Sequence, residues 1–313
     1  MVEALKQAVQ KARAMRARAD AAHPHVPAQA AAPEFFDDAA PPAGPAMTAQ
    51  VGAAQAGTTQ VVAAPDGHDR EAEVEAAWEK LEQIRLSSSH LEQHRLIAHA
   101  RNDPTHAAFD VLRTKLLGVF AKKGWTRLGI CSPGKGCGKT FTSANLALSL
   151  SRQADCRTLL VDMDLRSPGL ANTLGVTEAV PIAWLLNGEV DPQDFLMRQG
   201  RNLALALNSE KVRDAAETVL ATSTARALSD TQELLTPDVV IYDLPPMLVC
   251  DDVMGFLPQL DCVLLIIGGG KTRAADVTEC ERMLADQTPI LGVVLNNAEG
   301  VSTKQYGYGY GDD

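Results

Sequence analysis

The sequence has no excess of positive charge and no extended apolar segment. Its 29 lysines and arginines face 39 aspartates and glutamates, which gives a formal net charge of -10. A protein that binds nucleic acid normally carries a basic domain that neutralises phosphates. No apolar stretch reaches the roughly 18 residues that span a bilayer, and the N-terminus lacks the apolar block of a secretory signal. We therefore expect an acidic, cytoplasmic protein with no nucleic-acid partner.

Paired cysteines and late histidines are also missing. The six cysteines are irregularly spaced without a C-x-x-C motif, so neither a disulfide framework nor a zinc site is indicated. No histidine occurs after His106. A histidine base or metal ligand is therefore excluded from the C-terminal two thirds of the chain, where any general base must be a carboxylate.

Residues 1–70 are predicted to form a basic helix followed by a linker, and few residues from 21 to about 67 could support a packed interior. Residues 1–19 place apolar side chains at helical spacing among lysines and arginines, which predicts a short basic helix. That helix is either a solvated arm or a contact for anionic lipid or a partner. The alanine- and proline-rich stretch from residue 21 to about 67 predicts a disordered linker. Within it, Phe35 and Phe36 are either a docking motif or an incidental apolar pair.

Residues 71–125 are expected to be helical and to pack on the domain that follows. The stretch "EAEVEAAWEKLEQIRL" sets Val74, Trp78, Leu81 and Ile84 on one face, which predicts an amphipathic helix. A second helix is predicted over 105–120, after the break at Pro104.

Residues 126–300 alternate short apolar runs with longer helical patterns. Continuous apolar strands separated by helices are typical of a mostly parallel sheet buried on both faces. We therefore predict a doubly wound α/β domain whose ligands lie at the carboxyl ends of the strands. The predicted strands cover residues 128–131, 158–162, 203–207, 239–243, 262–267 and 290–296.

The stretch "SPGKGCGKT" follows the first of these strands and precedes a predicted helix, as a phosphate-binding loop does. Gly134, Gly136 and Gly138 let backbone N–H groups converge on an anion. Lys139 adds a charge for the outer phosphates, and Thr140 offers a hydroxyl to magnesium.

The strict loop pattern requires a glycine where Pro133 stands, so a plain turn remains the alternative. Cys137, inside the loop, is either a small filler or an oxidation-sensitive switch.

Carboxylates follow two of the predicted strands. Asp162 and Asp164 end one strand and Asp243 ends another, so all three are expected to face the loop, as a magnesium-nucleotide site requires. Asp251 and Asp252 fit helix caps or turn residues better.

Three elements carry a family resemblance: the loop "SPGKGCGKT", the stretch "LLVDMDLRSP" and the strand ending "IYDLPP". They resemble the Walker A, Walker A′ and Walker B elements of the bacterial tyrosine kinases of capsule and exopolysaccharide assembly, the CpsD/CapB group. That group is a branch of the MinD/ParA-like P-loop ATPases. The resemblance runs from about residue 105 to the C-terminus and includes "AFDVLRTKLL", "GGGKTRAADV" and "LGVVLN", but not residues 1–70.

The resemblance implies a P-loop NTPase that uses ATP and Mg2+. It implies that Lys139 and Thr140 hold the phosphates and magnesium, and that Asp164 and Asp243 order magnesium or its waters. Asp162 would accept the proton of the attacking hydroxyl, so that Lys139, Asp162 and Asp164 are the catalytic candidates. The nucleotide-binding candidates are Gly134, Lys135, Gly136, Cys137, Gly138, Lys139, Thr140, Phe141 and Asn296, the last as a base-reading asparagine.

The C-terminal residues 301–313 hold three of the four tyrosines of the chain. Tyr306, Tyr308 and Tyr310 are spaced by glycines, which predicts a flexible tail that can reach an active site, most readily that of a neighbouring copy. In the resembling family such a cluster is the autophosphorylation site. The alternative is a low-complexity tail without this role.

The expected function is an ATP-dependent protein-tyrosine autokinase that regulates exopolysaccharide or capsule polymerisation, chain length or export. Its expected partners are a membrane-embedded polysaccharide co-polymerase, which would recruit it to the membrane, and further copies of itself.

The chain departs from the family's E-x-x-R-x-x-R helix. Only Arg113 matches this pattern, since Ala107 and Asp110 occupy the other two positions.

The alternatives are a MinD/ParA-like switch ATPase and a low-turnover regulatory subunit. The switch ATPases carry a second lysine five residues before the loop lysine, whereas Lys135 lies four before Lys139.

Overall fold

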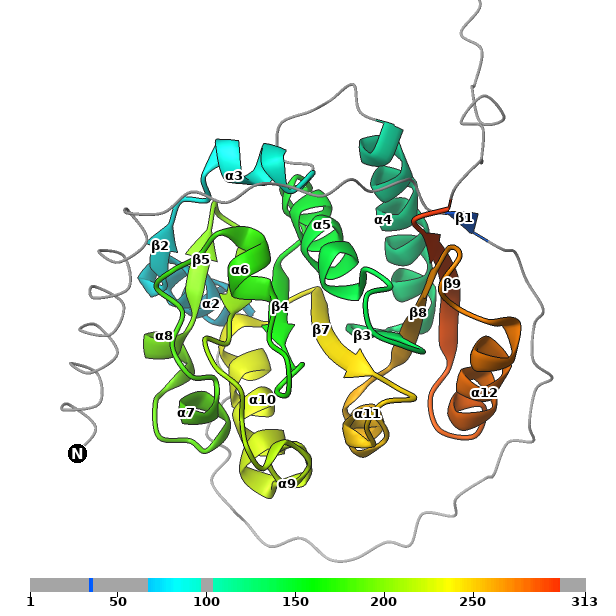
Figure 1. The fold of residues 1–313 in the computed structure, drawn as a ribbon. Helices are drawn as coiled ribbons and strands as arrows, with labels where there is room; N and C mark the ends of the chain where they lie inside the picture. The colour runs from blue at the N-terminus through cyan, green and yellow to red at the C-terminus, as the bar shows by residue number, and fades with distance from the viewer. Residues whose placement is uncertain (1–33, 36–66, 97–103, 299–313) are drawn as a thin grey trace, which may run out of the picture.

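The computed structural model describes residues 34–35, 67–96 and 104–298. The predicted basic helix, most of the predicted linker and the tyrosine tail lie outside these residues. In the described part of the chain, a sheet of nine strands has the order β1-β9-β8-β3-β7-β4-β6-β5-β2 (Figure 1).

Six neighbouring strands form the parallel centre of the sheet, and each coincides with a predicted apolar run. Crossover helices join parallel strands, so their carboxyl ends meet at one edge. The predicted doubly wound α/β fold is confirmed. The six strands are β3 (Arg127–Ser132), β4 (Thr158–Asp162), β6 (Leu203–Ala206), β7 (Val239–Pro246), β8 (Cys262–Gly268) and β9 (Ile290–Asn296).

Three short strands extend the edges. β5 (Met197–Gln199) pairs antiparallel with β6, and β2 (Glu82–Ile84) pairs with β5. On the other side, β1 (Glu34–Phe35) pairs antiparallel with β9. β1 lies within the predicted linker.

Alternate side chains of the central strands enter two different cores. In β8, Cys262 and Leu264 join the core beneath α4 and α5, whereas Val263 and Leu265 face the opposite core. This alternation follows from the two-residue period of a strand.

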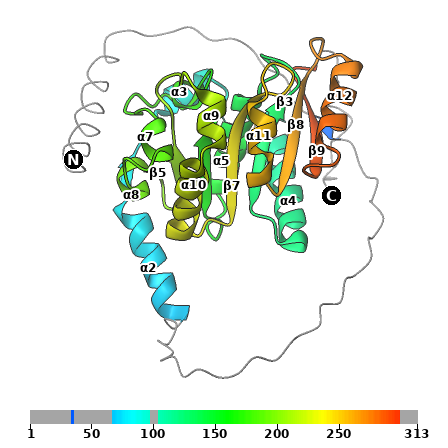
Figure 2. The ribbon, with the colours of Figure 1, turned by 90° about the horizontal axis from the view of Figure 1, so that it is seen from below.

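Helices cover both faces of the sheet (Figures 1 and 2). One face holds α3 (Ser88–Gln93), α4 (Pro104–Lys123), α5 (Lys139–Ser151) and α6 (Leu170–Leu174). The other holds α2 (Gly67–Lys80), α7 (Ala183–Leu186), α8 (Pro192–Phe195), α9 (Ala215–Leu220), α10 (Thr222–Leu235), α11 (Asp252–Phe256) and α12 (Ala274–Leu284), with a 3-10 turn at Leu257–Gln259.

The first amphipathic helix is shorter than predicted. α2 ends at Lys80 and Ile84 lies in β2, so the helical prediction for Ile84 is wrong. α2 packs against α10. There the buried Trp78 donates its indole N–H to the Leu235 carbonyl at 2.8 Å. Within the described residues, no helix combines the length and apolar character needed to cross a bilayer.

α4 packs along α5, the helix that follows the glycine-rich loop, and supports it. Phe109 meets Phe141 edge to face, with ring centroids 6.1 Å apart. Arg113 donates at 2.9 Å to the Ser149 carbonyl near the end of α5, which also accepts from Arg152 N at 3.4 Å. Arg113, the one residue that matches the family's E-x-x-R-x-x-R helix, therefore binds within its own chain.

Candidate functional site

The glycine-rich loop, residues 133–138, joins the end of β3 to the start of α5. Gly136 and Gly138 have φ values of 73° and 90°, which residues other than glycine rarely adopt. A Cβ on Gly138 would lie 1.9 Å from Nδ2 of Asn296. Glycine is therefore required at 138 both by conformation and by contact. The free N–H groups at the start of α5, a helix of 13 residues, face the loop and favour an anion there.

Three carboxylates lie on the neighbouring strands β4 and β7 or directly after them. Asp162 ends β4 as predicted, but β7 continues past Asp243 to Pro246, so the prediction that Asp243 ends its strand is wrong. Asp162 and Asp243 are partners in the parallel register, and Asp164 follows two residues after Asp162. Lys139 donates from Nζ to Oδ2 of Asp164 at 2.7 Å. The structure thus brings Lys139 and all three carboxylates into one buried cluster.

Lys139 stays charged in this cluster. Burial would lower its pKa, but the carboxylates of Asp243, Asp164 and Asp162 outweigh burial and raise the pKa above its ordinary value. A fixed cation is therefore present at the base of the loop.

Asp162 is held by backbone N–H groups. Its Oδ2 accepts from Gly169 and Leu170 at 3.2 and 3.1 Å, and its Oδ1 accepts from Asp164 N at 3.3 Å. Burial, followed by the charge of Asp243, raises the pKa of Asp162 well above its ordinary value, although the bonds from Leu170 and Asp164 oppose this. A carboxylate with a raised pKa is a stronger proton acceptor.

Asp243 has one oxygen to spare. Its Oδ1 accepts from Oγ of Ser143 at 2.9 Å, whereas its buried Oδ2 has no hydrogen-bond partner among the described residues. Burial raises the pKa of Asp243 to about 6, against the opposing charge of Lys139 and the hydroxyls of Thr140 and Ser143. An unpaired buried carboxylate oxygen is costly unless a ligand satisfies it.

This donor set fits magnesium that arrives with phosphates. Within the described ranges, no group of three histidine, cysteine, aspartate or glutamate side chains could hold a metal ion alone. Magnesium in nucleotide sites is commonly held by one or two carboxylates, waters and phosphate oxygens. The free Oδ2 of Asp243 and the hydroxyl of Thr140 suit that arrangement.

The remaining loop residues mainly shape the loop. Cys137 is buried, and its Sγ donates to the Gly134 carbonyl at 3.3 Å, which fits the small filler. Phe141 packs on α4, as described above. Lys135 is exposed.

Asn296 donates from its buried amide to the Cys137 carbonyl at 3.0 Å. Its contact in this structure is therefore with the loop, and base reading by Asn296 stays a prediction.

Two pairs at the site were not anticipated. Arg166, which follows Asp164, donates from Nε and Nη2 to the carboxylate of Asp252 at 2.7 and 2.8 Å. Asp252 is buried, so it holds the half-exposed Arg166 near the loop carboxylates and is not merely a helix cap. The side chain of Asp251 makes no capping bond. No spacing in the sequence links Arg166 to Asp252 or Ser143 to Asp243, because each pair joins distant elements.

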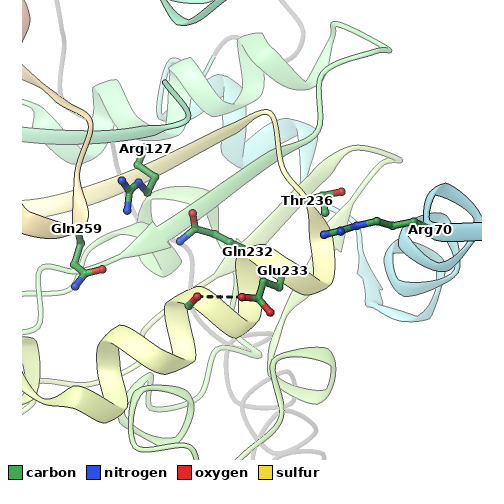
Figure 3. Close-up of a pocket in the computed structure, with 7 residues that line it drawn as sticks. Arg70, Arg127, Gln232, Glu233, Thr236 and Gln259 are labelled. Carbon is green, nitrogen blue, oxygen red and sulfur yellow. Dashed lines mark hydrogen bonds between the residues drawn. The ribbon is translucent and has the colours of Figure 1, made fainter. Parts of the chain in front are cut away.

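A hollow of about 300 Å³ lies at the other edge of the sheet (Figure 3). Arg127 begins β3, and Thr236 and Gln259 precede β7 and β8, while Arg70 reaches the hollow from α2. The hollow therefore belongs to the amino ends of the strands, away from the loop and its carboxylates.

Known proteins resemble this chain over the same region. Tyrosine-protein kinase CpsD of Streptococcus agalactiae is 29% identical over 211 residues, which cover 66% of this chain and 87% of that protein. The succinoglycan biosynthesis transport protein ExoP of Rhizobium meliloti is 27% identical over 169 residues, 52% of this chain but only 21% of ExoP. The crystal structure of the VpsO kinase domain superposes with a TM-score of 0.53 and 26% identity, over 61% of this chain and 94% of that domain.

Residues 128–307 match the family model described as the CobQ/CobB/MinD/ParA nucleotide binding domain. This range begins in the strand before the glycine-rich loop and includes all three carboxylates, and it makes up more than half of the chain. Loop, fold and family model agree, and the chain belongs to the CobQ/CobB/MinD/ParA nucleotide-binding family.

Proposed function

We propose that the protein is an ATP-dependent protein-tyrosine autokinase. The observation that carries the proposal is the cluster of Lys139 and three buried carboxylates beneath a glycine-rich loop, with one oxygen of Asp243 left for a ligand. This cluster occurs in a chain similar to CpsD, named a tyrosine-protein kinase, with three of its four tyrosines near its C-terminus.

In the proposed reaction, the loop N–H groups and Lys139 bind the phosphates of ATP. Lys139 exchanges its bond to Asp164 for phosphate oxygens, since an ammonium group is a phosphate ligand of the P-loop type. Asp164 is then released from Lys139. Together with Asp243 and Thr140 it would bind Mg2+ or its waters. Bound Mg2+ would neutralise charge that develops on the transferring phosphoryl group.

The acceptor is proposed to be a phenol of Tyr306, Tyr308 or Tyr310, supplied by a neighbouring copy. Its oxygen bonds to the γ-phosphorus while the bond to the leaving ADP oxygen breaks. Asp162 accepts the phenolic proton, for which its raised pKa suits it. No histidine lies in this part of the chain, so a carboxylate must serve as base.

The proposed setting is polysaccharide synthesis or export. ExoP is named a succinoglycan biosynthesis transport protein, and this chain matches only about a fifth of it. We therefore propose that a membrane-embedded polysaccharide co-polymerase supplies the portion that this chain does not match and recruits the kinase to the membrane.

The test is intact-mass spectrometry of the purified protein after incubation with Mg-ATP. Wild type should gain one to three phosphates. Lys139→Met, which removes the phosphate cation, and the triple Tyr306/Tyr308/Tyr310→Phe variant, which removes the acceptors, should gain none. ATP hydrolysis without added mass would reject the kinase proposal in favour of the switch ATPase. If neither added mass nor ATP hydrolysis is detected, the assay is repeated with the co-polymerase's cytoplasmic segment. If no phosphate is added then either, autophosphorylation is rejected.

A further inference from the structure

Three exposed apolar side chains lie on elements that border the glycine-rich loop and its carboxylates. Leu248 and Val249 follow the end of β7, and Leu220 ends α9. Their exposed fractions are 39%, 53% and 69%. Among the described residues, only Val111 on α4 is a further large apolar side chain with such exposure. Exposed apolar side chains that occur together are typical of an interaction surface.

Backbone and side-chain contacts bring these three residues into one region. Leu248 N donates to the Pro133 carbonyl at 3.1 Å, which places Leu248 beside the start of the glycine-rich loop. Leu220 lies against α11, the helix that follows Val249, because a Cβ on Gly255 would be only 3.0 Å from Cδ2 of Leu220. The three side chains therefore belong to adjoining elements, and we call them the apolar patch.

The loop that carries Asp164 contacts both elements of the apolar patch. Arg166, two residues after Asp164, donates to Asp252 at the start of α11. The Leu165 carbonyl accepts from Val212 N, in the loop that leads to α9, at 2.9 Å. The apolar patch is therefore next to the carboxylate cluster, on the side of the glycine-rich loop where β7, β4 and β6 lie.

The tyrosine tail has a sequence that suits such a surface. In an extended segment, side chains two residues apart point to the same face and lie roughly 7 Å from each other. Bound in this form, Tyr306, Tyr308 and Tyr310 would present three rings on one face and the intervening glycines on the other. When one tyrosine is at Asp162, the next ring must rest on the surface outside the site. Aromatic rings bury a large apolar area on such contacts.

The place where the tail begins favours a neighbouring copy as its source. The last described residue, Ala298, lies two residues after β9. In the strand order β9-β8-β3-β7-β4-β6, the glycine-rich loop follows β3, so β9 and the apolar patch lie on opposite sides of the loop. A tail of the same chain would have to cross the loop and the nucleotide bound in it, whereas the tail of a second copy can approach from the side of the patch.

Charge contributes little to this surface. Residues 210–214 expose two cations, Lys211 and Arg213, and two carboxylates, so their formal charges cancel. Arg166 is half-exposed, but its charge is paired with Asp252. The rings of the tail, and not its charges, must therefore provide most of the binding.

We propose that the apolar patch is the docking surface for the tyrosine tail of a neighbouring copy and holds the ring next to the tyrosine that is phosphorylated. The proposal rests on the proposed function, which makes the tail a substrate. The patch contacts the tail outside the reacting centre, equally before and during phosphoryl transfer. Loss of the patch should therefore weaken acceptor binding without slowing the chemical step.

The test uses two versions of the whole chain. The acceptor chain carries Lys139→Met, so it transfers no phosphate but keeps its tyrosines. The enzyme chain carries Tyr306/Tyr308/Tyr310→Ser, so its own tail offers neither a ring nor an acceptor. In the enzyme chain, Leu248→Ser with Val249→Ser should raise the KM for the acceptor chain roughly tenfold at unchanged kcat, because apolar contact is lost.

Matched variants separate docking from damage to the fold. Leu248→Met with Val249→Ile keeps the patch apolar and should keep the KM. Val111→Ser changes a similarly exposed side chain on α4, away from the patch, and should have no effect. The Kd of Mg-ADP and the temperature of thermal unfolding should be the same in all these variants, because the replaced side chains are exposed and are not part of the nucleotide site.

A second measurement does not require phosphoryl transfer. A fluorescein-labelled peptide of residues 299–313 should bind to the enzyme chain, as followed by fluorescence anisotropy, and the serine pair should weaken this binding roughly tenfold. A peptide with phenylalanine at the three tyrosine positions should bind equally well. A peptide with serine at these positions should not bind, because the rings make the contact.

An unchanged KM for the acceptor chain in the serine pair, or peptide binding that does not depend on the patch, would overturn the inference and leave the kinase proposal standing. Wild-type autophosphorylation at a rate independent of protein concentration, with no phosphate on the acceptor chain, would assign the tail to its own chain and also overturn the inference. Peptide binding that depends on the patch, in a protein that never phosphorylates tyrosine, would reject the kinase and keep the docking surface. Absence of both peptide binding and phosphoryl transfer would reject both.

Discussion

At the scale of single residues, the site depends on atoms that approach more closely than side chains normally permit. Gly138 is the clearest case. Its backbone has a left-handed conformation, and the amide of Asn296 occupies the space that a Cβ would need. The same amide holds the Cys137 carbonyl, so one contact links the loop to the last strand of the central sheet. Small changes at this contact should therefore alter the loop as a whole.

Gly138→Ala should abolish nucleotide binding and lower the free energy of unfolding by about 1–2 kcal/mol or more. A left-handed alanine costs about that much, and its Cβ also displaces Asn296. Calorimetry with Mg-ADP and urea unfolding measure the two effects. Gly134→Ala is the stability control, because a Cβ there meets no atom within 4 Å. Equal destabilisation by both substitutions would contradict the explanation.

At the scale of elements, the sequence predicted the central strands better than the edges. Continuous apolar runs mark strands buried on both faces, and all six predicted runs form strands. β2 and β5 have three residues each and include Glu82, Gln83, Arg198 and Gln199, so no apolar run marks them. Ile84 continued a helical pattern by spacing, but pairing with β5 prevails over that pattern.

The starts of β3 and β8 are joined by one carboxylate. Oδ2 of Asp261 accepts the N–H groups of Thr126 and Arg127, both at 2.8 Å, and Oδ1 accepts Nη2 of Arg127 at 2.7 Å. Burial alone would raise the pKa of Asp261, but the guanidinium and backbone N–H groups of Arg127 and that of Thr126 outweigh burial and lower it.

Because the folded-state pKa of Asp261 is depressed, its contribution to stability is present above its ordinary pKa of about 4 and is lost as pH falls through the lower folded value. Asp261→Asn should therefore lower the free energy of unfolding by about 1 kcal/mol at pH 7, with a smaller deficit in acid, where Asp261 is protonated in the folded protein as well. Urea unfolding across this range gives the measurement. Asp230→Asn, which removes an exposed pair with Arg226, should have little effect at any pH. A deficit that grows in acid would have the wrong sign.

At the scale of the whole molecule, the sequence located the site but not its internal contacts. Lys139, Asp162, Asp164 and Asp243 were predictable as neighbours, because each lies near the carboxyl end of a predicted strand and parallel strands end at one edge. The hydrogen bond from Lys271 to the Gly136 carbonyl in the loop and the pairing of Arg166 with Asp252 were not predictable. Such pairs depend on how separate loops settle against each other, and residue spacing carries no information on that.

Phosphorylation of the proposed acceptor tyrosines should loosen assemblies of the chain. Each phosphate adds about -1.5 to -2 charges at neutral pH. Three of them, beside Asp312 and Asp313, would raise the negative charge of a chain that already carries -10. Repulsion between such a tail and an acidic neighbour increases as salt is lowered, because screening weakens. Light scattering of samples with and without Mg-ATP treatment should therefore show a smaller mass after phosphorylation, most clearly at low ionic strength.

The triple tyrosine variant, treated in the same way, controls for ATP binding itself. An identical mass for phosphorylated and unphosphorylated wild type would show that the charge of the tail does not govern assembly.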